Sequence, residues 1–237
     1  MRYYLSITFC LALLLPAAAQ AQSLPVDYYH DDAVQLVARL VADDNTTDEL
    51  PEALIDSVEF ILWRVQGCDH PKAKIVAEKY AIHTRQSCNT HSFSFIVDGK
   101  VSWAQRLIDQ QTDLSRTPLQ EIVAAYKGTG IRLISHAGGL FHFAFYSERD
   151  MNMSFFSRQI SMLRDIDMVF LGTSLQASPT DFYPYDIRLR RISAGWIVSY
   201  HYRESPYADG DYHWQFGVPD KGKVRFLGEY GEVMPPD

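Results

Sequence analysis

The sequence lacks the motifs that would announce a biochemical activity. It contains no G-x-S-x-G nucleophile elbow, no H-E-x-x-H zinc motif, no P-loop and no G-x-G-x-x-G fingerprint. These patterns mark hydrolases, metalloproteases, NTPases and dinucleotide-binding enzymes, because each places a nucleophile, a metal ligand or a phosphate cradle at fixed spacing. The sequence alone therefore predicts no catalytic residue and no cofactor, and an enzymatic role has no positive support.

Basic residues are also few. The chain has 22 Lys and Arg against 29 Asp and Glu, a formal net charge of −7, and no basic stripe. Nucleic acids and anionic lipids are bound through clustered positive charge. The composition thus speaks against a nucleic-acid partner and against electrostatic binding to an anionic membrane surface.

Long apolar runs are absent except at the very start. Arg2 precedes an apolar run from Leu5 to Leu15, Pro16 breaks it, and Ala19 and Ala21 supply the small-x-small pattern of a cleavage site. This is typical of a secretory signal peptide. We expect cleavage after Ala21 and a soluble, secreted or periplasmic protein, since no later run approaches the roughly 20 apolar residues of a membrane span.

Cysteine is scarce, with three in the whole chain, and Cys10 lies inside the predicted signal peptide. Cys68 and Cys88 remain, and an even pair in an oxidising compartment favours a disulfide. Such a bridge would stabilise the fold by about 3 kcal/mol on the chain-entropy model. We expect the bridge, and two buried thiols are the alternative.

What the chain does contain is enough apolar sequence for a core, 47% of all residues. Residues 22–90 are predicted to be helical. Apolar positions recur at helical spacing in two stretches, from Val34 to Val41 and from Leu54 to Val65, with Pro51 before the second and Gly67 after it. Residues 70–88 fit either a short helix or a strand.

Residues 91–175 are predicted to form a ferredoxin-like βαββαβ unit. Their pattern gives the order strand, helix, strand, strand, helix, strand, with an insertion after the first strand. Thr117, Pro118 and Gln120 suggest a capping box for the first helix, and Asn152 suggests a cap for the second. The sheet is expected to be antiparallel, with both helices on one face.

Residues 176–237 are predicted to form a linker and a three-stranded β-meander, either separate from the central sheet or continuous with it. Together the three regions predict an α+β fold with N-terminal helices.

The stretch Val198–Phe216, "VSYHYRESPYADGDYHWQF", concentrates aromatic residues and histidines. Side chains alternate across a strand, so one face collects the even-numbered residues and the other face collects His201 and His213. If both aromatic rows join one core, even-numbered residues of the first strand must pair with even-numbered residues of the second. This pairing requires a loop over roughly 203–211 rather than a two-residue turn. The aromatic rows are Trp196, Val198, Tyr200, Tyr202, Tyr212, Trp214, Phe216 and Val218.

The histidine face has two interpretations. The simpler is an exposed sheet surface, the default for an antiparallel hairpin. The alternative is a binding patch for an acidic group or, less favoured, a metal, formed by His201, Arg203, Asp209, Asp211 and His213. No ligand set shows the count and spacing of a zinc site, so we expect no bound metal; His136 and His142 flank a Gly-Gly turn without a companion ligand.

Several phrases, taken in order, resemble an uncharacterised family of secreted bacterial proteins. They are "YYHDDAVQLVAR", "LPEALIDSV", "AIHTRQS" before a strand ending in "VDG", "LRDIDMVFLG" and the C-terminal "GWIVSYHYRE" and "YHWQFGVPDKGKVRFLGEYGEVMP". The resemblance implies an extracytoplasmic compartment and this architecture, and it implies no activity. Members often carry a cysteine pair in the hairpin after Gly-Trp, and here that loop has none. The split βαβ order also looks like the propeptide fold of subtilisin-type proteases, at the level of fold alone.

Three functions are compatible with these features. The leading one is a non-enzymatic extracytoplasmic protein that binds a protein or an envelope component. The second is a protease inhibitor or propeptide-like module, which needs an exposed sheet face, edge or tail. The third is a hydrolase that uses His201 and His213.

Overall fold

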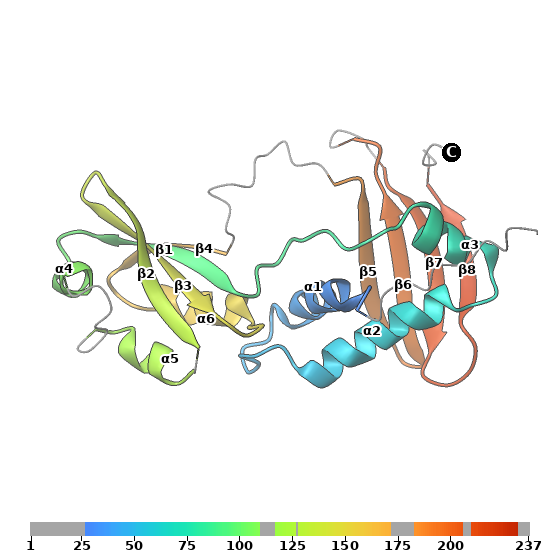
Figure 1. Ribbon diagram of the computed structural model, residues 1–237, viewed down its shortest axis with the longest axis horizontal. Helices are drawn as coiled ribbons and strands as arrows, with labels where there is room; N and C mark the ends of the chain where they lie inside the picture. Colours follow the sequence, from blue (N-terminus) through green and yellow to red (C-terminus); the bar gives the residue numbers. More distant parts are fainter. Residues whose placement is uncertain (1–26, 110–116, 127, 172–182, 206–209, 232–237) are drawn as a thin grey trace, which may run out of the picture.

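The structure is a computed structural model that describes residues 27–109, 117–126, 128–171, 183–205 and 210–231. It contains two four-stranded antiparallel sheets, each with helices packed against it. Figure 1 shows the two units side by side along the long axis of the molecule. The α+β class expected from the sequence is confirmed, whereas the predicted signal peptide and Asp209 lie outside the described residues.

The first unit, which we call the helix–meander unit, combines the two ends of the described chain. Helices α1 (His30–Val41) and α2 (Glu52–Gln66) lie against one face of a sheet with strand order β5-β6-β7-β8 (Figure 1). The apolar stripes of both helices and the inner face of the sheet form one core. Its strands are β5 (Tyr185–Ile192), β6 (Gly195–Tyr202), β7 (Tyr212–Pro219) and β8 (Arg225–Tyr230).

The aromatic rows of β6 and β7 lie on that inner face, as the alternation predicts. Tyr200 pairs with Trp214 and Val198 with Phe216, even with even, and all four side chains are buried. The strands end at Tyr202 and resume at Tyr212, so the longer connection is also confirmed. Register thus decides which residues enter the core.

This unit differs from the prediction in one strand, and it decides two alternatives that the sequence left open. The stretch expected to be one strand is a hairpin, β5 and β6, closed at Ser193 and Ala194 with Gly195 at φ 146°. The ambiguous segment after α2 forms the short helix α3 (Pro71–Lys74) and a π-helical turn, Ile75–Lys79. The C-terminal sheet is separate from the central one and has four strands rather than three.

The second unit has the ferredoxin-like topology, with strand order β2-β3-β1-β4 and antiparallel pairing throughout. Its helices supply apolar residues to a single core on one face of the sheet. The elements are β1 (Ser92–Asp98), α4 (Ser102–Asp109), α5 (Gln120–Ala124), β2 (Thr129–Ala137), β3 (Leu140–Ser147), α6 (Met153–Ser161) and β4 (Ile166–Phe170).

The cap predicted for α6 is confirmed, whereas α5 begins later than its capping motif predicts. Asn152 caps α6 by accepting a hydrogen bond from the Phe155 amide at 3.2 Å. Helix α5 begins only at Gln120, because residues 117–119 form a turn in which the Gln120 amide donates to the Thr117 carbonyl. Part of the insertion before this turn forms α4, which was not predicted.

Asn152 also ties the two units together. Its buried amide donates to the carbonyls of Val41, at 2.8 Å, and Thr47, at 2.9 Å, in the loop after α1. Its backbone amide donates to the Asp48 carbonyl at 2.8 Å. One side chain thus starts α6 and satisfies backbone groups of the other unit.

The expected disulfide is not present. Cys68 and Cys88 are free, half-buried thiols at the edge of the core of the helix–meander unit. Cys88 is held to α1 by Gln35, whose side chain accepts from its amide at 3.0 Å and donates to its carbonyl at 2.9 Å. Cys68 follows the C-terminus of α2 and lines a different hollow from Cys88. Independent anchoring of the two segments accounts for the unpaired thiols.

The buried aromatic row makes a direct prediction about stability. Trp214 is 1% exposed and contacts Tyr212 edge-on with ring centroids 4.9 Å apart. Trp214→Ala should lower the free energy of unfolding by about 3–5 kcal/mol, as aromatic truncations in cores do. Phe60→Ala, at an aromatic that is 63% exposed on α2, should change it by less than about 0.5 kcal/mol. Equal effects in urea unfolding would show that the even-numbered row does not form the core.

The junction makes a second prediction. Asn152→Asp keeps an oxygen for the Phe155 amide but removes the donor to the buried carbonyls, so it should destabilise by about 2–4 kcal/mol. Asn89→Asp is the matched control: the Oδ1 atom of Asn89 accepts from two backbone amides, and its amide donates only to the Ser92 hydroxyl, which can donate back to a carboxylate. Thermal unfolding should leave the control near wild type. A wild-type Tm for Asn152→Asp would contradict the role of the amide.

Candidate functional site

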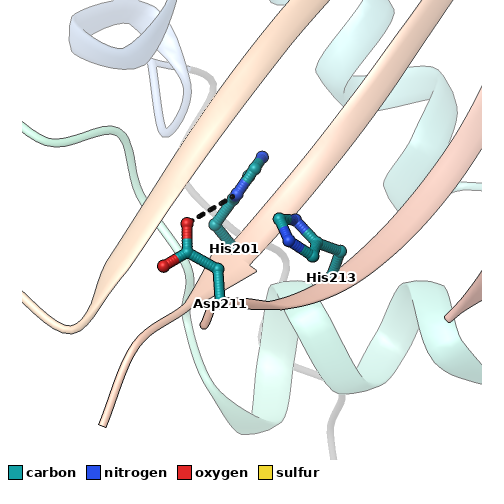
Figure 2. Close-up of side chains that lie close together, drawn as sticks. All are labelled: His201, Asp211 and His213. Atoms are coloured by element: carbon teal, nitrogen blue, oxygen red, sulfur yellow. Dashed lines mark ion pairs between the residues drawn. The ribbon is translucent and has the colours of Figure 1, made fainter. Parts of the chain in front are cut away.

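Two histidines and an aspartate meet on the outer face of the helix–meander sheet (Figure 2). His201 of β6 and His213 of β7 are direct partners in the register, so their side chains leave the sheet on the same side. Asp211 lies immediately before β7, at the end of the connection from β6. The register that buries the aromatic rows therefore also brings these three side chains together.

The three groups are close and converge. The imidazole rings of His201 and His213 contact edge-on, with centroids 4.3 Å apart. The Nδ1 atom of His201 lies 3.5 Å from Oδ2 of Asp211, and one ligand atom from each residue lies within 4.8 Å of the others. On the other side of His213, Tyr230 stacks against it with centroids 4.8 Å apart. Ring contacts on two sides thus hold His213 in place.

His201 is buried, although the simpler interpretation of the sequence made it an exposed sheet residue. It is 7% exposed, and within the described residues its Nε2 atom has no hydrogen-bond partner while its Nδ1 atom has only the 3.5 Å contact with Asp211. Burial, together with the charge of Arg188 and with His213, lowers the pKa of His201 to about 4. Burial also lowers the pKa of His213. Both imidazoles are therefore neutral at pH 7 and offer nitrogen lone pairs.

Asp211 supplies the negative charge of the site. Burial alone would raise its pKa, but the hydrogen bond and charge of Arg203, with His201, lower it overall. Arg203 Nε donates to Oδ1 at 2.5 Å, which leaves Oδ2 turned toward His201. Arg188 of β5 lies 3.7 Å from the same Oδ2 atom. The carboxylate is ionised and oriented by Arg203.

The structure brings together four of the five residues predicted as a binding patch, His201, Arg203, Asp211 and His213, and Asp209 lies outside the described residues. Sequence reasoning missed Arg188 and Tyr230, which come from the flanking strands. The alternation of side chains along β5 and β8 could have placed residues of both strands on the histidine face. Only the register of the two strands shows which of these residues lie beside the histidines.

His136 and His142 do not form a joint site. His136 pairs with Phe141 and His142 with Ser135, so the two histidines lie on opposite faces of the ferredoxin-like sheet. His136 contacts the Phe141 ring at 4.4 Å, whereas His142 is buried on the face away from the helices.

Sequence reasoning also missed the pair that Asp32 forms with His83. Buried Asp32 of α1 accepts from the amide and hydroxyl of Thr84 and contacts Nδ1 of His83 at 2.7 Å. The hydrogen bond to Asp32 raises the pKa of His83. Every contact of this pair holds the segment after the π-helical turn against α1, and Ala81 in that segment has a φ of 44°. The geometry indicates a structural clamp.

A separate feature is the open face of the ferredoxin-like sheet. The register places Ile96 of β1, Ala144 of β3 and Met168 of β4 on the face opposite the helices. Met168 is 53% exposed. The exposed large apolar residues on this face are Leu140, Tyr146, Met168 and Phe170. The register also places charged Arg132 and Asp98 and uncharged polar residues on this face, so the exposed apolar side chains lie among few charges. The polar residues are Ser92, Ser94, Ser135 and His142.

Comparisons with known proteins found no matching family model, no matching curated protein and no matching solved structure. Among the described residues, the helices are too short or too polar to traverse a bilayer.

The buried imidazole makes a prediction about pH. Since folding lowers the pKa of His201 from 6.5 to about 4, the unfolded chain binds more protons as the pH falls below 6.5. The contribution of neutral His201 to the free energy of unfolding is complete above pH 6.5 and is lost as the pH falls from 6.5 to about 4. With a chelator present, the free energy of unfolding of wild type should fall by about 2 kcal/mol more than that of His201→Gln when the pH is lowered from 8 to 5. Urea unfolding at both values checks this, and equal losses in the two proteins would contradict it.

Proposed function

We propose that this protein is a non-enzymatic extracytoplasmic binding protein that contacts a protein partner through the open face of its ferredoxin-like sheet. The observation that supports this most is the group of exposed apolar side chains on that face, Leu140, Tyr146, Met168 and Phe170. Met168 and Phe170 are neighbours on this face of β4, and groups of exposed large apolar side chains often mark binding surfaces. The N-terminal sequence pattern supports the compartment.

The chemistry of the face favours a protein over a small ligand. An antiparallel sheet with one face covered by helices offers a broad, shallow surface rather than a cavity. Tyr, Phe and Met are enriched at the centres of protein interfaces, where charged residues are depleted. A flat apolar face with few charges, Arg132 and Asp98, fits the same description.

A hydrolase centred on the histidines has less support. A general base works best when its pKa lies near the working pH, and burial has lowered that of His201 to about 4. The hydroxyl of Ser199 on the same face of β6 already accepts a hydrogen bond from Gln215 at 3.1 Å. An inhibitor or propeptide-like module, in contrast, is a special case of the proposal, because it would also present the open face to a protein.

Site-specific photocrosslinking tests the proposal in cells that express the protein. A crosslinker at Met168 should give one discrete protein adduct that mass spectrometry identifies, and a crosslinker at exposed Phe60 of α2 should not give it. With that partner purified, Met168→Glu should weaken binding by at least about 10-fold at unchanged Tm, as expected for a residue at an interface centre.

Three outcomes would count against the proposal. The first is the same adduct from both positions, and the second is wild-type affinity of Met168→Glu. The third is an adduct with a second copy of this chain, which would assign the face to self-association instead.

A further inference from the structure

We propose that His201, His213 and Asp211 bind one divalent transition-metal ion, with zinc as the reference ion. The site lies on the helix–meander unit, apart from the sheet face proposed to bind a protein, so either proposal can fail without the other.

The arrangement of donor atoms carries this inference. Zinc binds imidazole nitrogen at about 2.0–2.1 Å and carboxylate oxygen at about 2.0–2.2 Å, which puts tetrahedral ligands about 3.3–3.5 Å apart. His201 Nδ1 and Asp211 Oδ2 are already 3.5 Å apart, and the ligand atoms of all three residues lie within 4.8 Å. Any wider separation involves His213, so binding would need a small movement of the Asp211 carboxylate or of that ring. Figure 2 shows the carboxylate and both rings turned toward a common point.

The burial of unpartnered nitrogens is the second, independent observation. Buried polar atoms are normally hydrogen-bonded, because an unpaired one costs about 1–3 kcal/mol. Nε2 of His201 and Nδ1 of His213 lack a partner within the described part of the chain, Nδ1 of His201 has only the 3.5 Å contact with Asp211, and His201 is more than nine-tenths buried. A metal ion is a natural partner for such a pair, since neutral imidazole is among the commonest metal ligands.

The charges around the site favour a cation over an anionic ligand. Neutral imidazoles present lone pairs, and Asp211 adds a negative oxygen, so an acidic ligand would face repulsion. The two arginines nearby have other acceptors: Arg203 donates to the other carboxylate oxygen, and Arg188 Nε contacts Asp186 at 3.4 Å. Arg188 Nη2 also lies 3.7 Å from the ligating Oδ2 atom, a contact that a bound metal ion would replace. Arg203 then acts as the outer partner that orients a ligating carboxylate.

The ligand set also specifies the class of ion. Two imidazoles and one carboxylate suit zinc and its first-row neighbours, whereas calcium and magnesium prefer all-oxygen sites. Three protein ligands leave a fourth position of a tetrahedral zinc site open to solvent or to another ligand.

Competition with a chromophoric zinc chelator tests the proposal, using the chain without its predicted signal peptide and without a polyhistidine tag. Wild type should bind one zinc per chain with micromolar or tighter affinity. His213→Gln and Asp211→Asn should each weaken binding by more than the about 10- to 100-fold that loss of an outer partner costs. His30→Ala removes an exposed histidine on α1 and should bind like wild type.

A second readout keeps the test decisive if a variant folds poorly. In wild type, zinc should shift the imidazole NMR signals of His201 and His213 and leave those of His30 and His136 unchanged. Absence of saturable one-to-one binding by wild type, wild-type affinity in both ligand variants, or zinc-induced shifts confined to other histidines would each overturn the proposal.

Discussion

The antiparallel register of β6 and β7 is the constraint on which the rest of the helix–meander unit depends. It pairs Tyr200 with Trp214 on the inner face and His201 with His213 on the outer face. A slip of one residue would exchange these faces, exposing the aromatic rows and burying the histidines in the apolar core. The free energy from burying large aromatic side chains against α1 and α2 therefore also fixes where the histidines lie. The core and the candidate site are two consequences of one pairing.

The order of elements along the chain makes the two units interdependent. The helices α1 and α2 and the sheet they cover are separated in sequence by the whole ferredoxin-like unit. The core of the helix–meander unit therefore closes only when both ends of the chain have met, a contact of long sequence separation that is slow to form. Asn152 lies at the junction, where it caps α6 and satisfies carbonyls after α1. A polar, hydrogen-bonded junction of this kind fixes one relative position in a way that apolar packing alone does not.

Much of the fold could be predicted from the sequence because strong periodicity sets it locally. The stripes of α1 and α2, the βαββαβ order and the alternation in β6 and β7 each follow from side-chain spacing. Predictions failed where a tertiary contact overrides a local signal. The stretch Tyr185–Tyr202 alternates like one strand, yet it pairs with itself as the β5–β6 hairpin. The cysteine pair suggests a bridge, yet Gln35 holds the Cys88 segment against α1 instead.

The candidate site was predictable in part for the same reason. Alternation placed His201 beside His213, but it carries no information on what covers the outer face of a sheet. The surroundings of His201 include Asp186, its partner on β5, and the charge of Arg188, and the sequence does not specify how that strand pairs.

The histidine pair sits where the backbone is held most firmly. His201 and His213 are the chain neighbours of Tyr200, which is fully buried, and of Trp214, which is 1% exposed. Packing on the inner face thus fixes the backbone directly behind both imidazoles, while Tyr230 and Arg203 fix His213 and Asp211 from the side. Sites built on strands with locked neighbours hold their geometry better than sites on loops. Folding of the unit has then already met most of the entropic cost of bringing the two rings together. A ligand bound there has mainly to adjust the carboxylate, which lies at the end of a loop rather than inside a strand.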